Sequence, residues 1–442
     1  MTFEPPQPLQ SYPLPPNKAS SAQSVDVLVL GGGAAGFFAA LSAKEANPTA
    51  HVVIVEATHQ PLAKVKISGG GRCNVTHACH DPAELVTRYP RSHKTLRHLF
   101  SQFGPTQTIE WFQSRGVRLK TEADGRMFPV TDDSQTIMDC LQRERIQSGV
   151  VLRTGERVQR ITPTTYGFSV DTESKSGNVQ WHTKAVIVAT GGSGGGYKLL
   201  EALRLPMITP SPSLFTFKVD DPALQALQGV SVPHVVGTLI PKEGQTKAKP
   251  IVQEGPLLIT HWGLSGPCIL RLSAWGARML HEQHYQAELR LNWWPELTQD
   301  AIRQWLLVNK QDHPKQQMVN QSPPSIPKRL WEYLLAKHGQ QHGYQPTALW
   351  GEMPNKTLNL LAEALVRWPI TINGKGVFKE EFVTAGGVAT SALNLKTYEA
   401  KALPGLFVVG EAVDVDGITG GFNFQHAWTS GWVAGQSVLK PH

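Results

Sequence analysis

The sequence predicts an α/β protein in which a Rossmann-like dinucleotide-binding domain is interrupted by a long insertion. Three features indicate this fold class: a glycine fingerprint after an apolar strand near residue 30, a return of buried-strand patterns after residue 378, and a different pattern between them. With 442 residues, the chain is long enough for two or three domains that each bury a core.

The start of the chain, its apolar runs and its cysteines argue against a secreted, membrane-spanning or disulfide-linked protein. Residues 1–24 are polar and rich in proline and have no apolar core, so they predict a disordered arm and neither a secretory signal nor a strand. No run approaches the roughly 18 apolar residues that a membrane helix needs. The four scattered cysteines, Cys73, Cys79, Cys140 and Cys268, lack the pattern of a disulfide framework, which favours a reducing, cytoplasmic setting.

The fingerprint lies between an apolar run, residues 25–30, and a small-residue stretch, residues 37–46. The run predicts a strand buried on both faces, and the stretch predicts a helix. Gly31, Gly33 and Gly36 stand between them in the spacing G-x-G-x-x-G. The first glycine permits a tight turn, the second lets the backbone approach a pyrophosphate, and the third lets the helix pack closely on the strand.

A second strand, residues 51–56, follows this unit and ends in Glu56. Glu56 lies 20 residues after Gly36, where a carboxylate can accept hydrogen bonds from ribose hydroxyls. Glycines alone would predict only a loop. Strand, glycines, helix, strand and acid together predict a dinucleotide site.

Residues 61–74 predict a loop of exposed backbone amides, because three consecutive glycines lie between Lys64 and Arg72. Such a loop suits phosphates or an electron-rich ring system. A flexible surface loop is the alternative, which the adjoining dinucleotide fingerprint disfavours. Residues 93–147 predict mainly helices, with a tight turn at 125–129 between them. A small antiparallel β unit, residues 150–170, then leads to a buried strand at 184–188.

The pattern changes in the insertion, where short strand-like pieces give way to helices and then to one returning strand, residues 366–378. No internal repeat is present. The predicted boundaries are 1–24 for the arm, 25–204 and 378–442 for the dinucleotide-binding domain, 205–292 and 366–377 for a β-barrel-like insert, and 293–365 for a helical subdomain.

The C-terminal tail predicts a second cradle for a cofactor. A strand at 406–409 is followed by Gly410-Glu411, by Asp414 and Asp416, and by Gly420-Gly-Phe-Asn423 at the start of a helix. Acids can bind polyhydroxyl chains, and a helix N-terminus stabilises negative charge. A nicotinamide enzyme does not need a second cofactor-binding segment so far along the chain. A flavin does, because its ribityl chain and reduced ring need support. The tail therefore favours FAD.

Net charge is +7, with an isoelectric point near 9.1, and most proteins of this kind are merely basic. The excess is uneven, because residues 64–126 contain eleven Lys or Arg against five acids. Such a segment can attract a polyanion, which keeps nucleic acid as a possible partner.

In its motifs the chain resembles the BaiN/RdsA (YhiN, HI0933-like) family of NAD(P)/FAD-dependent oxidoreductases, over about residues 25–437. The motifs are Gly31-Gly-Gly-Ala-Ala-Gly36, Lys64 with Ser68-Gly-Gly-Gly-Arg-Cys-Asn-Val-Thr76, Gly125-Arg-Met-Phe-Pro129, Ala189-Thr-Gly-Gly192, Thr260-His-Trp-Gly-Leu-Ser-Gly-Pro267, Thr384-Ala-Gly-Gly-Val388, Gly410-Glu-Ala-Val-Asp-Val-Asp-Gly417 and Gly420-Gly-Phe-Asn-Phe-Gln425.

The resemblance implies a glutathione-reductase-type FAD-binding domain with a β-barrel and helical insertion, and NAD(P)H as the reductant. By position it implies Gly31, Gly33 and Gly36 at the pyrophosphate, Glu56 at the adenosine ribose, Lys64, Gly70, Gly71, Arg72, Cys73 and Asn74 near the flavin, and Thr190, Gly191, Glu411, Asp414, Gly420, Gly421, Phe422 and Asn423 closing over the cofactor. Ala34, Ala35, Ala57, Val158, Ala189 and Gly410 complete the predicted set. No second G-x-G-x-x-G follows a strand, so NAD(P)H would visit the flavin transiently, or another donor serves.

The family diverges in its substrates. The resemblance implies reduction of a uridine in large-subunit (23S) ribosomal RNA to dihydrouridine, reduction of bile-acid-like steroids, or chemistry on small amines or ketones. The basic segment favours RNA. A base could stack on Trp262, Trp293 or Trp294, although tryptophans more often pack in a core. An RNA-binding assembly protein with structural FAD is the alternative outside enzymes.

Several single residues have two interpretations. Cys73 could act as a general acid that protonates one carbon of a double bond, or it could be a small residue packed under the ring. A zinc site at Cys73, His77, Cys79 and His80 is disfavoured because the spacing lacks the usual pairs. His261 could contact a ligand or serve as a structural donor, and Arg126 could hold a phosphate or its own turn.

Overall fold

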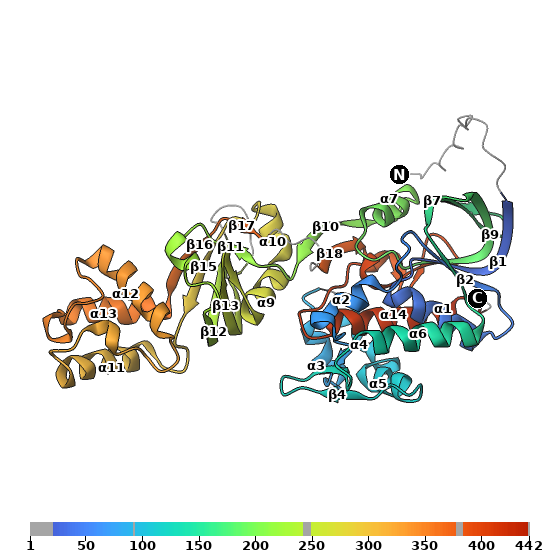
Figure 1. Cartoon of the computed structure of the whole chain (residues 1–442). Helices are drawn as coiled ribbons and strands as arrows, with labels where there is room; N and C mark the ends of the chain where they lie inside the picture. Colours follow the sequence, from blue (N-terminus) through green and yellow to red (C-terminus); the bar gives the residue numbers. More distant parts are fainter. Residues whose placement is uncertain (1–20, 92, 242–248, 377–382, 441–442) are drawn as a thin grey trace.

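The computed structural model describes residues 21–91, 93–241, 249–376 and 383–440, and places them in two lobes joined by a pair of strands (Figure 1). Of the predicted arm, residues 1–20 lie outside the described residues. Residues 21–24 belong to strand β1, which begins at Ser21, so the predicted start of this strand at residue 25 is four residues late.

The first lobe is built on a sheet whose central strands run parallel, as the Rossmann prediction requires. Its strands are β6 (Val151–Thr154), β2 (Val52–Glu56), β1 (Ser21–Leu30), β9 (Gly177–Val188) and β21 (Leu406–Val408), in this spatial order, followed by antiparallel β20 (Glu399–Ala400) and β19 (Leu393–Asn394). Residues 27–30 and 185–188 are fully or almost fully buried, which explains their continuous apolar sequence.

Two helices that are far apart in sequence lie against each other in this lobe (Figure 1). They are α1 (Ala34–Ala46) and α14 (Phe422–Ser437). A Cβ atom at Gly431 would lie 2.5 Å from the carbonyl oxygen of Ala35, and one at Gly435 would lie 2.4 Å from that of Ala39. The two backbones therefore touch at residues without side chains, and the C-terminal helix is held beside the fingerprint helix.

The remaining elements of the first lobe surround this core. They are α2 (Ala63–Gly71), α3 (Pro82–Leu85), α4 (His93–Gln102), α5 (Pro105–Gln113), α6 (Gln135–Ser148), α7 (Gly194–Ala202), the small sheet β3 (Thr76–His77), β5 (Arg126–Pro129) and β4 (Leu119–Thr121), and the meander of β7 (Glu156–Thr164) and β8 (Gly167–Ser174) with β9.

Two local predictions were wrong. Residues 126–129, predicted as a turn between helices, form the central strand of the small sheet. Residues 151–154 pair in parallel with β2 and not with the antiparallel meander. In both cases tertiary pairing decided the conformation of a short segment whose local pattern was weak. The glycines between Lys64 and Arg72 form the predicted loop, because Ser68, Gly69 and Gly70 within α2 are non-helical and Gly71 has a φ of +85°, whereas residues 63–67 before them are helical.

The second lobe contains a sheet that closes on itself. Its strands are β16 (Trp368–Ile372), β15 (Ala287–Asn292), β12 (Ser231–Ile240), β13 (Ile251–Thr260), β14 (Gly263–Ser265), β11 (Phe217–Lys218) and β17 (Gly374–Lys375), in spatial order. The two edge strands, β16 and β17, are separated by Asn373 alone, so one segment of chain joins both edges. The predicted strand at 366–378 is therefore two short strands, and its last two residues lie outside the described residues.

Helices complete the second lobe: α8 (Pro222–Gln225), α9 (Pro267–Trp275) and α10 (Ala277–Glu282) beside the strands, and α11 (Gln299–Asp312), α12 (Lys328–His342) and α13 (Asn355–Val366) beyond them. Helices α9 and α10 were missed by the prediction of strands throughout 205–292. Leu239 and Leu289 of the sheet belong to the same hydrophobic cluster as Trp331 and Leu361 of the helices. Sheet and helices thus share one core.

A two-stranded antiparallel ladder joins the lobes (Figure 1). Strand β10 (Met207–Ser213) carries the chain out of the first lobe, and β18 (Val383–Val388) carries it back. Among the described residues, no helix is long and apolar enough to cross a membrane.

Candidate functional site

The carboxyl ends of the parallel strands β2, β1, β9 and β21 meet at one edge of the first lobe's sheet. In open α/β sheets this edge is where ligands bind. The predicted cofactor residues after these strands, which begin at Gly31, Ala57, Ala189 and Gly410, therefore lie at a common edge although they are spread over the whole chain.

The glycines of the fingerprint have three different environments. Gly31 has a φ of +112°, and a Cβ there would lie 2.4 Å from the carbonyl oxygen of Ala189. A Cβ at Gly36 would lie 2.0 Å from the carbonyl oxygen of Gly31. Around Gly33, by contrast, no atom lies within 4 Å of the Cβ position. The first and third glycines are required by packing, and the second leaves open backbone at the start of α1, where a phosphate can approach.

Glu56 is fixed at the end of β2 by three donors. Its Oε2 accepts from the backbone N–H of Gly32 at 2.7 Å, and its Oε1 accepts from the N–H and the hydroxyl of Thr58, each at 2.8 Å. A carboxylate has about four acceptor positions. One therefore remains for a ribose hydroxyl. Val158 lies nearby on β7, a strand that contacts β2, and is half-buried.

The turn after β9 contains a polar atom that a ligand would satisfy. The hydroxyl of Thr190 is buried and has no hydrogen-bond partner among the described residues. Around Gly194 and Gly195, at the start of α7, no atom lies within 4 Å of the Cβ positions. A buried hydroxyl beside open backbone fits a bound group with polar atoms, as the phosphates and ribityl chain of FAD would provide.

Lys64 on α2 and Arg72, which follows that helix, have partners in different places. Lys64 forms an ion pair with Glu411, which crosses from α2 to the turn after β21. Arg72 turns away: it pairs with Glu122 at 2.6 Å and with Asp132 at 3.4 Å, and its guanidinium lies 3.9 Å from the centre of the Phe128 ring. Gly70 and Gly71 have open Cβ positions. Arg72 thus has its partners in the small sheet and its neighbourhood, and the backbone of Gly70 and Gly71 is open to a ligand.

Cys73 is fully buried, with 0% of its surface exposed, and belongs to the hydrophobic core of the first lobe. Its backbone has a φ of +61°, in the left-handed region. Burial raises the pKa of its thiol to about 12. A thiol without surface cannot touch a substrate in this conformation, so the geometry favours the packing interpretation over the general acid.

The tail segment is held by partners on many elements. Asn423 binds the backbone of Gly417 through both its amide oxygen and its amide nitrogen, at 2.8 and 2.9 Å. Phe422 is buried and stacks on His77, with ring centres 4.8 Å apart. A Cβ at Gly421 would lie 2.6 Å from the carbonyl oxygen of Thr76 and 2.9 Å from the side-chain oxygen of Asn74. The start of α14 therefore lies directly against the segment after α2.

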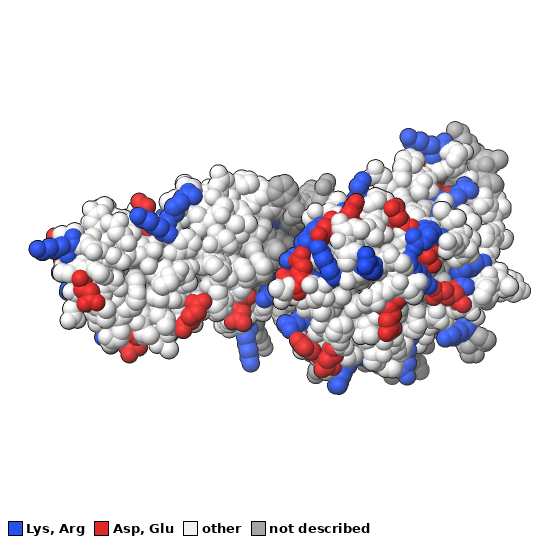
Figure 2. Space-filling view, turned by 60° about the horizontal axis from the view of Figure 1, so that its bottom comes forward, with Lys and Arg blue, Asp and Glu red and all other residues white. Residues whose placement is uncertain are grey.

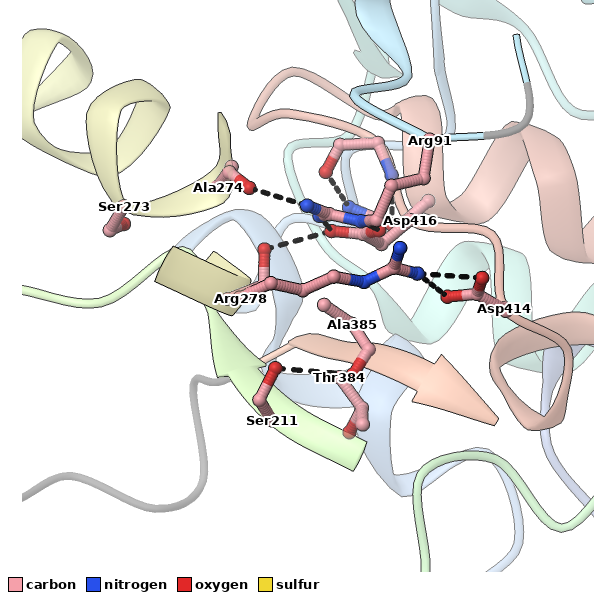
Figure 3. Close-up of polar contacts among 12 residues, drawn as sticks. Arg91, Ser211, Ser273, Ala274, Arg278, Thr384, Ala385, Asp414 and Asp416 are labelled. Carbon is pink, nitrogen blue, oxygen red and sulfur yellow. Dashed lines mark hydrogen bonds and ion pairs between the residues drawn. The ribbon is translucent and has the colours of Figure 1, made fainter. Parts of the chain in front are cut away.

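Asp414, predicted at the cofactor, has a partner from the other lobe. It accepts from Arg278 of α10 through both carboxylate oxygens, each at 2.7 Å (Figure 3). Sequence reasoning missed Arg278, and it missed Arg91, Ser213 and Tyr197, which contact the same segment. No local pattern could reveal them, because every one of these partners lies more than 100 residues away in the sequence.

The basic segment is largely neutralised. Seven of its cations form ion pairs with acids: Lys64, Arg72, Arg88, Arg91, Arg115, Lys120 and Arg126. Lys66, Arg97 and Arg118 have no ion pair with a described residue. Acidic and basic side chains alternate on the face of the first lobe shown in Figure 2 and do not separate into a field of one sign. The excess of cations in the sequence therefore does not form a continuous basic surface here.

The remaining candidates have mostly structural surroundings. Trp293 and Trp294 are buried in the core of the second lobe, whereas Trp262 is half-buried and lies 3.8 Å, ring centre to centre, from the exposed His261. Arg126 binds Glu122 and Asp124 across its own turn. The four cysteines are free and buried, and no group of three metal-binding side chains occurs in the described part of the chain.

Known proteins resemble this chain over nearly its whole length. The family model of the HI0933-like protein Rossmann domain matches residues 25–437. A protein named ribosomal RNA dihydrouridine synthase from Escherichia coli is 30% identical over 427 residues, which cover 94% of this chain and 98% of the relative. A 3-dehydro-bile acid delta(4,6)-reductase from Clostridium scindens is 27% identical, with 93% and 98% covered.

A solved structure shows the same fold at lower identity. The 3-ketosteroid-delta4-(5alpha)-dehydrogenase from Rhodococcus jostii superposes with a TM-score of 0.51 and 14% identity, and the match covers 95% of this chain and 97% of the other. At this identity the likeness concerns the fold alone.

Proposed function

Because this chain belongs to the HI0933-like family, it is an oxidoreductase with a Rossmann-type FAD-binding domain, and we propose that it reduces a uridine of large-subunit (23S) ribosomal RNA to dihydrouridine in the cytoplasm. The observation that carries this proposal is the 30% identity, over almost the full length of both chains, to a relative named for that reaction. We propose NAD(P)H as the source of the electron pair.

The proposed reduction requires residues that bind and orient the cofactor. The reaction adds two electrons and two protons across the C5=C6 bond of the uracil, and FAD, when bound and reduced by NAD(P)H, would supply the hydride that reaches one of these carbons. The open backbone at Gly33 is suited to the pyrophosphate, the free acceptor position of Glu56 to the ribose, and the unpaired hydroxyl of Thr190 to a polar atom of the cofactor. These groups bind and orient, and none of them needs to change its protonation.

A conjugated steroid is the second candidate substrate. The bile acid relative is named for reducing double bonds conjugated to a keto group, and the C5=C6 bond of uracil is likewise conjugated to a carbonyl. The pairing of seven cations in segment 64–126 weakens the electrostatic reason for preferring RNA. Both candidates share one reaction class, the reduction of a carbon–carbon double bond next to a carbonyl.

The test compares large-subunit ribosomal RNA from cells with and without this protein. We expect the deletion to lack one dihydrouridine, and wild-type protein but not Gly33→Asp to restore it, because an acid at this position would repel the pyrophosphate. Arg290→Gln, a surface change in the second lobe, should restore it like wild type. An unchanged dihydrouridine profile in the deletion would overturn the RNA proposal. In that case, reoxidation of the NAD(P)H-reduced flavin by a conjugated 3-ketosteroid would identify the second candidate.

A further inference from the structure

Two carboxylates are buried where the lobes meet. Asp414 and Asp416 lie between β21 and α14, and their side chains are 10% and 0% exposed. A carboxylate removed from water without a cation costs several kcal/mol. The conformation of this segment therefore depends on the cations that reach it.

The first cation comes from the first lobe. Arg91 donates from Nε to Asp416 at 2.6 Å and pairs with its second oxygen through Nη2, while Ser213 of β10 donates to the same carboxylate at 2.9 Å (Figure 3). The remaining terminal nitrogen of Arg91 donates to the carbonyl oxygen of Ala274 on α9, at 3.0 Å. Arg91 thus binds Asp416 with two of its nitrogens and contacts the second lobe with the third.

The second cation comes from the second lobe. Arg278 of α10 donates to both oxygens of Asp414 at 2.7 Å, and its side chain is 44% exposed. The N–H of Asp414 donates to Val388 at the end of the connecting ladder, at 2.9 Å. Three residues before Asp414 stands Glu411, which accepts from the N–H of Thr384 on the same ladder at 2.9 Å. The second lobe therefore binds Asp414 directly through Arg278 and reaches Asp416 only through Arg91.

We propose that Arg278 is a positioning residue for the cofactor. From the second lobe it fixes Asp414, and through Asp414 it fixes the cofactor-binding ends of segment 410–423. FAD affinity therefore depends on docking of the second lobe. Because such coupling is reciprocal, bound FAD also strengthens the docking. The inference rests on the FAD-binding part of the proposed function and not on its substrate.

The first test is FAD affinity, measured by flavin fluorescence, of wild type, Arg278→Gln and Arg278→Lys. Arg290→Gln is the matched control, since Arg290 is a second-lobe arginine of similar exposure, 48%, whose partner Glu288 lies on the same strand. We expect Arg278→Gln to raise the dissociation constant of FAD about tenfold, Arg278→Lys to raise it less, and the control to leave it unchanged. Equal affinity in Arg278→Gln and the control would overturn the proposal.

The second test asks whether Arg278 acts through Asp414. If it does, adding Arg278→Gln to Asp414→Asn changes the affinity little further, whereas two independent losses that multiply would contradict the inference. In protein without FAD, amides of residues 411–418 should exchange hydrogen faster in Arg278→Gln, while those of β12 keep the wild-type rate. Unaltered exchange in 411–418 would also overturn it. Neither readout uses the enzymatic reaction, so failure of the dihydrouridine assay and failure of this inference remain distinguishable.

Discussion

Two parts of the candidate cofactor site are built in opposite ways. The turn at residues 31–36 is held by its neighbours, since Gly36 lies against the carbonyl of Gly31 and the N–H of Gly32 binds Glu56 on the adjacent strand. Segment 410–423 is held by cations from afar: Lys64, Arg91 and Arg278 are 347, 325 and 136 residues away from the acids that they bind.

The difference lies in what each part depends on. The turn depends mainly on shape, because Gly31 and Gly36 lie so close to neighbouring carbonyl groups that no side chain fits there, and its one contact with an acid is made by a backbone N–H and needs no cation. The segment depends on charge, because two acids are buried there and their cations come from different lobes. Removing a cation should therefore damage the segment, whereas adding a methyl group should damage the turn. Two experiments test this contrast, and a third tests the packing of Cys73.

Arg91→Met should have the largest effect. It leaves Asp416 buried without its cation, which costs about 3–5 kcal/mol of unfolding free energy at neutral pH. Burial raises the pKa of Asp416, and Arg91 opposes this rise. In the variant the opposition is gone, so the folded-state pKa lies further above the unfolded value, and stability should recover as the pH falls below it. Denaturant unfolding from neutral to acidic pH measures this.

Asp416→Asn is the companion change for that experiment. Combined with Arg91→Met, it removes the buried charge and should recover part of the stability and most of the pH dependence. A loss below about 1 kcal/mol in Arg91→Met, with no dependence on pH, would show that the segment does not depend on charge.

Gly36→Ala and Gly33→Ala should separate packing from binding within the turn. At Gly36 the methyl group meets the carbonyl of Gly31 at 2.0 Å, so we expect a loss of about 1–3 kcal/mol in the protein without FAD. At Gly33 it meets nothing within 4 Å, so stability should change by no more than about 0.5 kcal/mol while FAD affinity falls. Thermal unfolding of both variants with and without FAD distinguishes packing from binding. Equal losses of stability in the two variants without FAD would contradict the assignment of Gly36 to packing and Gly33 to binding.

Cys73→Ala should cost roughly 1–2 kcal/mol of stability, less than the loss of a buried cation, because it empties a small buried volume and leaves the left-handed backbone unchanged. If Cys73 only packs, the turnover of FAD-loaded variant should match wild type. A drop in kcat of about 100-fold or more, with normal FAD content, would instead establish Cys73 as the general acid.

The sequence predicted the parts of the fold that repeat a local rule. Residues 27–30 and 185–188 are buried strands because they are apolar throughout, and the glycine turn follows from its spacing. The turn at 125–129 was wrong because strand β5 is defined by pairing with residues on both sides of it. The contact of Arg278 with Asp414 could not be predicted from the sequence, because it forms only where the two lobes meet.

The ladder of β10 and β18 has a consequence for how such chains can change. Because the strands that leave and re-enter the first lobe are antiparallel neighbours, the whole second lobe begins and ends at one point. The second lobe can therefore be exchanged as a unit between relatives without changing the connections within the first lobe. An incoming lobe must carry an arginine for Asp414, or the host domain must replace that acid, because Arg278 belongs to the second lobe and Asp414 to the first.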